Sequence, residues 1–238
     1  MLKFLEFPMA ARIDTKTKLL NSAEELFIAN GIAAVSFREI NRAAGQRNAS
    51  ALHYHFSNRE RLLEALIDRR MPAVDAKRVE LMAICEAAPR EAQMRALTEA
   101  IVLPLANTVR TREDRLNWVQ LHARIYQYDD FDFGRYFADR GYTMGLLTVR
   151  RVYGELRPEL PQIVRDQRVM FSVRMAVHTL SDWQRGVIPK QSLIPDGDFP
   201  SFLGNLLDMI EACLAAPCSD TTRERFAAQG YRRVDDLP

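Results

Sequence analysis

The sequence predicts an all-α protein with an N-terminal three-helix helix-turn-helix domain and a larger C-terminal helical bundle. Three observations predict this fold. Apolar residues recur at helical spacing along most of the 238 residues, strand-like alternation is nearly absent, and two serine-led capping boxes bracket a very short segment. With 47% hydrophobic and 27% charged residues, the chain can bury a core in one or two domains.

The N-terminal helices follow from their stripes and their end signals. A one-sided apolar stripe from Leu19 to Phe27 ends at Asn30-Gly31, a common helix stop. The sequence SFRE at 36–39 is a capping box and predicts a second helix that runs to Ala44. A third, short helix is expected at 49–56, because a second capping box, SNRE at 57–60, opens a fourth helix directly after it.

The rest of the chain reads as helices separated by proline-bearing or polar breaks. Pro72 should kink or interrupt the fourth helix, which places a domain boundary near residue 70. Later helices are expected at 73–87, 91–109, 113–127, 133–156, 161–186 and 199–216, with a loop at 189–200. The predicted organisation is an arm at 1–14, the helix-turn-helix domain at 15–70, the bundle at 71–217, and a loosely held tail at 218–238.

Composition narrows the class of protein. No run reaches the ~18 apolar residues that a membrane-spanning helix needs, and Glu6 and Pro8 interrupt the opening stretch, so we expect a cytoplasmic protein. Cys85, Cys213 and Cys218 form no CxxC pair, so neither disulfides nor a metal site is predicted. Residues 1–63 carry nine Lys/Arg against six Asp/Glu, an excess at the end where contact with nucleic acid would need it.

The third helix has the pattern of a helix that enters the major groove of DNA. On a helical wheel Ala49, Leu52 and Phe56 face inward. The candidate DNA-facing residues are Arg47, Ser50 and Tyr54, with His53 and His55 on the flanks. The alternative is an ordinary solvated helix face, although such a face more often carries Glu or Lys.

The stretch VSFREINRAAGQRNASALHYHFSNRERLLEAL resembles the DNA-binding region of the tetracycline-repressor (TetR) family over roughly residues 15–65. Two departures stand out: Gly45 to Phe56 is one residue longer than the commonest version, and His53 stands where Tyr is most frequent. The resemblance implies that Ser36 binds a phosphate, and that Arg47, Asn48 and Ser50 approach base edges, with Arg47 suited to guanine. It also implies that His53 and Tyr54 touch phosphates and thymine methyls, and that Arg59 clamps the DNA backbone.

The resemblance further implies that the second domain binds a small, largely apolar effector, which releases the protein from double-stranded DNA. Two helical stripes are candidates for that site, Trp118, His122 and Tyr126, and Phe171, Met175 and His178. Each stripe can equally be plain core. The acidic and aromatic segment 126–133 can cage a cation, or can be a turn in which Asp130 or Asp132 caps the next helix.

The two long C-terminal helices carry more apolar surface than one core can cover. One face should therefore meet a second copy of the chain, and the resemblance implies a homodimer built from these helices. The predicted interface residues are Val173, Val177, Leu180, Leu203, Leu206, Leu207 and Ile210.

The resemblance as a whole favours a ligand-responsive transcriptional repressor that binds an inverted-repeat operator. The alternative is a helical small-molecule-binding protein or enzyme in which the helix-turn-helix is not used for DNA. The four histidines form no HExxH, and no phosphate-binding loop or nucleophile elbow is present, so neither enzymatic activity nor a cofactor is predicted. Turnover of a ligand and the salt dependence of DNA binding would separate these classes.

Overall fold

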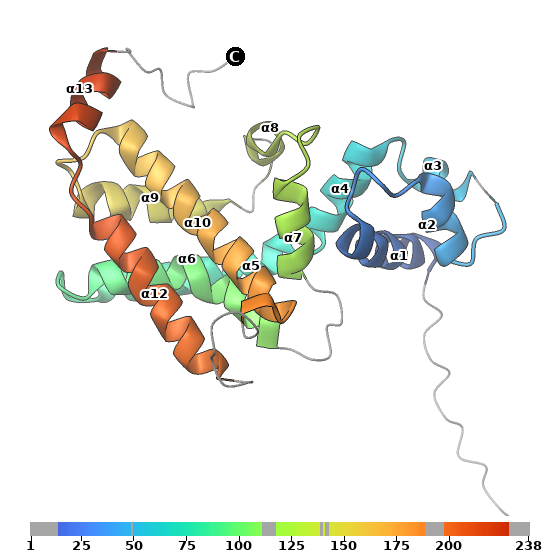
Figure 1. Cartoon of the computed structure of the whole chain (residues 1–238), viewed down its shortest axis with the longest axis horizontal. Helices are drawn as coiled ribbons and strands as arrows, with labels where there is room; N and C mark the ends of the chain where they lie inside the picture. Colours follow the sequence, from blue (N-terminus) through green and yellow to red (C-terminus); the bar gives the residue numbers. More distant parts are fainter. Residues whose placement is uncertain are drawn as a thin grey trace, which may run out of the picture. The chain divides into compact units, whose positions relative to one another are not determined.

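A computed structural model describes residues 14–48, 50–110, 118–138, 140, 143–188 and 198–228 of the chain. Every regular element in these ranges is a helix, as predicted (Figure 1). In chain order the helices are α1 (Thr15–Asn30), α2 (Phe37–Ala43), α3 (Ala51–His55), α4 (Arg59–Asp68), α5 (Met71–Ala87), α6 (Gln93–Arg110), α7 (Trp118–Tyr126), α8 (Phe133–Ala138), α9 (Met144–Leu156), α10 (Gln162–Gln184), α12 (Phe199–Ala215) and α13 (Asp220–Ala228).

The chain divides into two compact units, Met1–Leu66 and Ile67–Pro238, so the division falls inside α4. The predicted arm at 1–14, apart from Asp14, lies outside the described residues. So do Ala49, most of the loop predicted at 189–200 and the last residues of the predicted tail.

The first unit is a small bundle in which α1 packs on α2 and α2 packs on α3. Its core holds fully buried side chains from each of the four helices, among them Phe27, Ile40, Leu52 and Leu63. Gly31 ends α1 with φ of 85°, and Gly45 follows α2 with φ of 66°. Both values lie in the left-handed region that glycine adopts most easily, which confirms the two glycine stops expected from the sequence.

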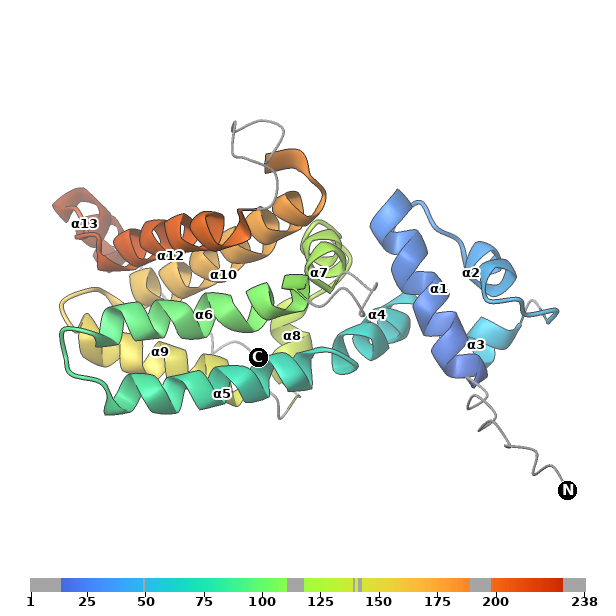
Figure 2. The same ribbon diagram turned by 90° about the horizontal axis from the view of Figure 1, so that it is seen from below.

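The second unit is a bundle of longer helices (Figure 2). Helix α5 lies along α6 and α9, and α10 packs against α6, α7, α9 and α12. Gly145, at the start of α9, allows the close approach to α5, because a Cβ atom there would lie 2.9 Å from both Arg78 Cβ and Asp75 Oδ1. Asp75 Oδ1 accepts a hydrogen bond from the Gly145 amide at 3.0 Å and so binds the free N-terminus of α9.

Three helix boundaries differ from the sequence prediction. The single helix predicted at 133–156 is two helices, α8 and α9. Pro72 does not kink a continuing helix but lies in the first turn of α5, where its missing N–H costs no hydrogen bond. The predicted tail contains α13, so residues 220–228 are helical and not loosely held.

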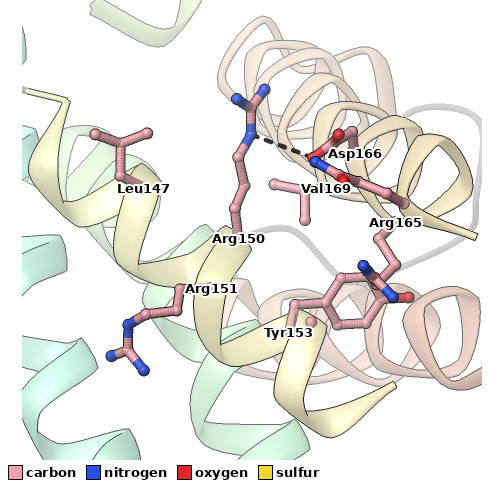
Figure 3. Close-up of a pocket in the computed structure, with 9 residues that line it drawn as sticks. Leu147, Arg150, Arg151, Tyr153, Arg165, Asp166 and Val169 are labelled. Atoms are coloured by element: carbon pink, nitrogen blue, oxygen red, sulfur yellow. Dashed lines mark ion pairs between the residues drawn. The ribbon is translucent and has the colours of Figure 1, made fainter. Parts of the chain in front are cut away.

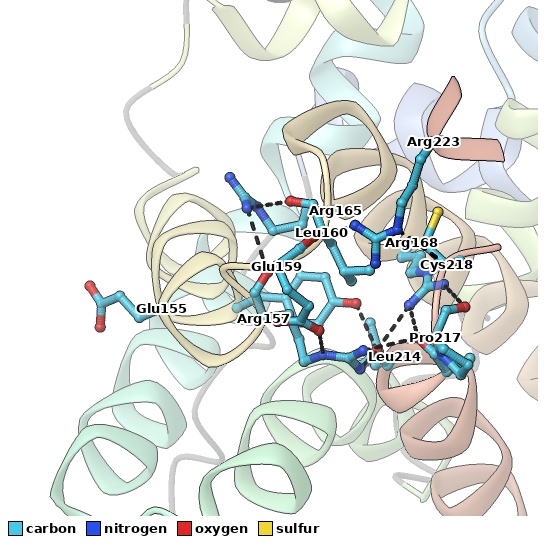
Figure 4. Close-up of polar contacts among 12 residues, drawn as sticks. Glu155, Arg157, Glu159, Leu160, Arg165, Arg168, Leu214, Pro217, Cys218 and Arg223 are labelled. Atoms are coloured by element: carbon cyan, nitrogen blue, oxygen red, sulfur yellow. Dashed lines mark hydrogen bonds and ion pairs between the residues drawn. The ribbon is translucent and has the colours of Figure 1, made fainter. Parts of the chain in front are cut away.

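Arginines close the C-terminal end of α12 and hold the segment that follows (Figure 4). The carbonyl oxygen of Leu214 accepts hydrogen bonds from the Tyr153 hydroxyl and from Arg157, both at 2.8 Å. Arg168 donates to the Ala216 carbonyl at 2.5 Å. Arg223 of α13 donates to the Glu159 carbonyl at 2.6 Å. Since the last carbonyls of a helix have no partner inside the helix, these bonds satisfy the end of α12 and hold α13 against the loop before α10.

Candidate functional site

The helix-turn-helix is fixed by caps at its helix starts. Ser36 Oγ accepts a hydrogen bond from the Glu39 amide at 3.3 Å, and Glu39 Oε2 accepts from the Ser36 amide at 2.7 Å, which confirms the predicted capping box. These bonds to Ser36 lower the pKa of Glu39. The Ser36 hydroxyl also donates to Glu39, so the group expected to bind a phosphate already has a partner.

The second predicted capping box is wrong by one residue. Asn58, not Ser57, accepts the hydrogen bond from the Arg61 amide, at 2.8 Å, and α4 begins at Arg59. Asn is among the residues that most favour the N-cap position, and here Asn58 takes that position in place of Ser57.

Helix α3 presents the expected polar face. Leu52 and Phe56 are buried, and the Leu52 amide donates to Oδ1 of the buried Asn41 at 3.1 Å, which fixes the packing of α3 on α2. On the opposite side Arg47, Asn48, Ser50, His53 and Tyr54 are exposed and His55 is half-buried. The Tyr54 side chain is 86% exposed, which is unusual for a large ring and suits a residue that contacts a partner.

Two of the residues predicted to contact DNA also form hydrogen bonds within the protein. Asn48 Oδ1 accepts from the Ser50 amide at 2.9 Å, in a turn that starts α3, so its amide nitrogen and one lone pair of Oδ1 are left for a base. The guanidinium of Arg59 donates to the carbonyls of Ile32 and Val35, the latter at 2.8 Å. Arg59 therefore fastens the α1–α2 connection to the first turn of α4, a role that the sequence analysis did not include.

In the second unit, three of the predicted effector residues form a ladder of rings on α7. The Trp118 and His122 rings stack with centroids 4.9 Å apart, and the His122 and Tyr126 rings stack at 4.6 Å. Phe133 packs on Tyr126 at 4.7 Å, and His178 of α10 lies 6.2 Å from Tyr126. We call Trp118, His122 and Tyr126 the ring ladder.

The second predicted stripe only partly joins the ring ladder. His178 reaches Tyr126, and Met175 is half-buried. Phe171 is 57% exposed on α10, so its side chain does not join the ring ladder. The acidic segment before α8 provides a cap, since Asp132 Oδ1 accepts from the Arg135 amide at 3.1 Å.

The surroundings of the ring ladder carry positive charge. Arg78 of α5 is 3% exposed, and its Nε donates to the Ala100 carbonyl at 3.3 Å. Burial, together with the charges of Arg78, His178 and Arg174, lowers the pKa of His122 from 6.5 to about 3, so His122 is neutral. The sequence analysis missed Arg78, although it follows Val74 and precedes Met82 on the apolar stripe of α5.

Comparison with known proteins decides what the first unit is. Residues 19–66 match the model of "Bacterial regulatory proteins, tetR family". Residues 19–66 therefore form a domain of the tetR type.

Solved structures of TetR-type regulators share the fold of most of the chain. NalD from Pseudomonas aeruginosa, the secondary repressor of the MexAB-OprM multidrug efflux pump, is 19% identical, with a TM-score of 0.51 over 82% of this chain and 94% of that one. A TetR-family regulator from Vibrio parahaemolyticus is 16% identical, with a TM-score of 0.50 over 82% of this chain and 98% of that one. FadR from Bacillus halodurans, a regulator of fatty acid degradation, is 14% identical, with a TM-score of 0.50 over 84% and 98%. No curated protein matches the sequence.

Within the described ranges, no single helix is long and apolar enough to cross a membrane, and only α12 and α13 pass that test as a pair, bent by 66°. In the same part of the chain, no group of three His, Cys, Asp or Glu side chains is placed to hold a metal ion.

The residues predicted to form the dimer interface lie mostly inside the single chain. Val173, Val177, Leu180, Leu206, Leu207 and Ile210 are each at most 9% exposed, and Leu203 is half-buried. Helices α10 and α12 use these side chains to pack on each other and on α6. The stripes are apolar, as predicted, and six of these seven side chains are buried in the core of the single chain, so only Leu203 keeps exposed surface for a partner.

A cavity of about 340 Å³ lies between α9 and α10 (Figure 3). None of the predicted effector residues lines it. Its walls include Tyr153, Arg150 and Asp166, and Arg150 Nε lies 3.9 Å from Asp166 Oδ1.

Proposed function

We propose that this TetR-family protein is a cytoplasmic, non-enzymatic transcriptional repressor that binds an inverted-repeat operator as a homodimer and leaves it when a small molecule binds the second unit. The observation that carries this proposal is the exposed face of α3. Arg47, Ser50 and Tyr54 project from a short helix that Leu52 and Asn41 anchor from behind. A short helix with one anchored and one polar face is the form that enters a major groove. NalD, described as a repressor, shares the fold.

Access to the major groove assigns different tasks to the residues of the first unit. Arg47 is the one long side chain with hydrogen-bond donors on the exposed side just before α3, and we assign it to a guanine. We assign Tyr54 and His53 to phosphates and thymine methyl groups, with His55 at the edge of the contact. Ser36 and Arg59 mainly support the fold, because both side chains already have partners.

The homodimer in this proposal uses a different face from the one expected from sequence. Ser201, Asn205, Met209, Ala212 and Cys213 are uncharged residues on an exposed side of α12, with Asp208 at its edge. The acidic residues next to this side are held elsewhere, since Asp208 and Glu211 both bind Arg95 of α6. Met170 and Phe171 add exposed apolar area on α10. An uncharged, partly apolar helix face is what a dimer of these two helices needs.

A route for the signal is present within the second unit. Phe133 of α8 packs on the ring ladder and on Phe131, whose ring lies 5.5 Å from that of Tyr136. The Tyr136 hydroxyl donates to Asp68 Oδ1, at the end of α4, at 2.6 Å. Because α4 continues into the first unit, an effector that shifts α8 would pull on the helix that carries the DNA-binding domain. For this to cause release, the effector must bind the DNA-incompetent arrangement more tightly.

The test of this proposal is direct. The full chain is titrated with a duplex enriched from a random library, and with a scrambled duplex of the same composition, at several salt concentrations. The proposal requires tighter binding to the enriched duplex and an affinity that falls as salt rises. Equal, salt-insensitive binding to both duplexes would favour the alternative, a helical binding protein that does not use its helix-turn-helix for DNA. Consumption of a bound small molecule would show an enzyme.

A further inference from the structure

The ring ladder contains two buried ring nitrogens that lack a partner. Trp118 is 1% exposed and His122 is 3% exposed, and neither Trp118 Nε1 nor His122 Nδ1 has a hydrogen-bond partner among the described residues. Buried polar groups are almost always paired, so each exception asks for an explanation. The indole Nε1 can only donate. The group that is missing from this site is therefore a hydrogen-bond acceptor.

The charges around the ladder show which kind of acceptor fits. Arg78 is buried on one side, with Asp75 Oδ1 3.9 Å from its Nη1. Asp75 also binds the N-terminus of α9. The guanidinium of Arg174 lies 4.6 Å from the centre of the Tyr126 ring, on the other side. Asp75 offsets part of the charge of Arg78, but both guanidinium groups still lower the pKa of His122, so the site favours an anion over a cation.

The shape of the ladder favours a flat molecule. The planes of Trp118 and His122 are inclined by 29° and those of His122 and Tyr126 by 25°, so the rings are stacked nearly parallel. Trp118 is the buried end, whereas Tyr126 is half-buried and lies beneath the exposed Arg174. A flat aromatic ring packs well against such a set of rings.

The cavity between α9 and α10 is a weaker candidate for an anion. Two of its three arginines face carboxylates, as Figure 3 shows for Arg150 and Asp166. Arg151 is paired with both Glu86 and Glu155. The third, Arg165, donates to the carbonyls of Arg157 and Leu160, so much of the positive charge along this cavity is offset by the protein itself.

We propose that the ring ladder binds a planar aromatic anion, an aromatic carboxylate, whose ring packs against the rings of the ladder and whose carboxylate accepts from Trp118 Nε1–H. Arg78 and Arg174 supply the compensating charge. This refines the largely apolar effector expected from the sequence, because the body of the ligand is apolar and one end is anionic. The inference rests on the proposed function only in so far as it makes this ligand the effector.

The experiment uses Trp118 as its own probe. The chain has two tryptophans, and Trp183→Phe leaves Trp118 as the only indole. Trp183 stacks on Phe202, so phenylalanine preserves the ring contact. Emission of Trp118 is followed during titration with benzoate, with benzamide, its neutral analogue of similar shape, and with benzylamine, a cation. We expect a saturable change with benzoate, at least tenfold weaker binding of benzamide and no binding of benzylamine.

Two variants locate the site. Arg174→Gln changes an exposed residue and should keep the fold while weakening benzoate at least fivefold and removing its advantage over benzamide. Arg150→Gln, in the cavity between α9 and α10, is the matched control and should leave benzoate binding unchanged. Equal binding of benzoate and benzamide would overturn the proposal. So would loss of binding in Arg150→Gln but not in Arg174→Gln, which would place the anion in the cavity.

Measuring DNA binding by the same protein tests the anion site and the proposed function separately. If the chain binds its enriched duplex and no benzoate, the repressor stands and the anion site is wrong. If it binds benzoate at Trp118 but no duplex, the anion site stands and the repressor is wrong. Release of the enriched duplex by benzoate, and not by benzamide, would support both.

Discussion

His122 should make the second unit sensitive to mild acid. Its pKa is about 3 in the folded protein, against 6.5 for an ordinary histidine, because the ring is buried beside Arg78 and Arg174. Protonation is therefore much easier in the unfolded chain. The folded state keeps its full stability above pH 6.5 and loses stability as the pH falls from there towards 3. At about 1.4 kcal/mol per pH unit, the free energy of unfolding at pH 5 should be lower by about 2 kcal/mol than at pH 7.

Urea unfolding at pH 7 and pH 5, followed by tryptophan emission, measures this loss. Both tryptophans lie in the second unit, so the signal reports on that unit, and the protein concentration is held fixed in case the chain dimerises. His122→Phe keeps a ring in the ladder and should remove most of the difference between the two pH values. His178→Phe is the control: burial also lowers the pKa of His178, but His178 is only half-buried and Asp182 opposes the shift, so this change should remove less of the difference. An undiminished pH effect in His122→Phe would refute the reasoning.

Four further predictions concern the proposed function. Arg47→Ala should weaken binding to the enriched duplex by ~1–3 kcal/mol and should change the affinity for scrambled DNA little. Equal losses of affinity for both duplexes would mean that Arg47 contacts the DNA backbone and not a base. Arg59→Ala should lower the free energy of unfolding by ~1.5–3 kcal/mol, because its hydrogen bonds to two backbone carbonyls are lost. If stability is unchanged and the salt dependence of DNA binding becomes flatter by about one unit, Arg59 is a phosphate contact instead. Met209→Arg changes an exposed residue of α12 and should convert the dimer to a folded monomer in sedimentation, whereas Leu207→Arg places a charge in the core and should unfold the chain. If the Met209→Arg protein is still a dimer, the exposed side of α12 is not the interface. Tyr136→Phe should bind DNA and effector normally but release DNA less completely, and full release would exclude the bond to Asp68 as part of the route.

The elements that sequence predicts well here are those fixed by local chemistry. The Ser36–Glu39 capping box and the stops at Gly31 and Gly45 depend on residues a few positions apart, and the structure confirms them. The inward face of α3 was also recognisable, because Leu52 and Phe56 are apolar residues at helical spacing. Local patterns can also be ambiguous, because both Ser57 and Asn58 are suitable N-cap residues and the structure uses Asn58.

What sequence did not predict depends on contacts between distant residues. Arg59 looked like a surface cation, but its carbonyl partners, Ile32 and Val35, come from a loop that the fold brings beside it. The apolar stripe that includes Leu207 was taken for a partner face, since periodicity shows that a face is buried without showing what buries it. The segment after α12 looked polar and loose, and Arg223 tethers it to a carbonyl 64 residues earlier in the chain.

The most direct test of the account is selection of duplexes from a random library by the full chain, followed by sequencing and by measurement of affinity. If α3 reads DNA in a two-fold dimer, the enriched duplexes should contain an inverted repeat whose half-sites lie about one helical turn apart, or a multiple of it. Arg47→Ala should then relax the preference at one base pair in each half-site. Selection that enriches no common sequence, or Arg47→Ala protein that selects the same repeat with the same preference, would contradict the claim that this face reads DNA.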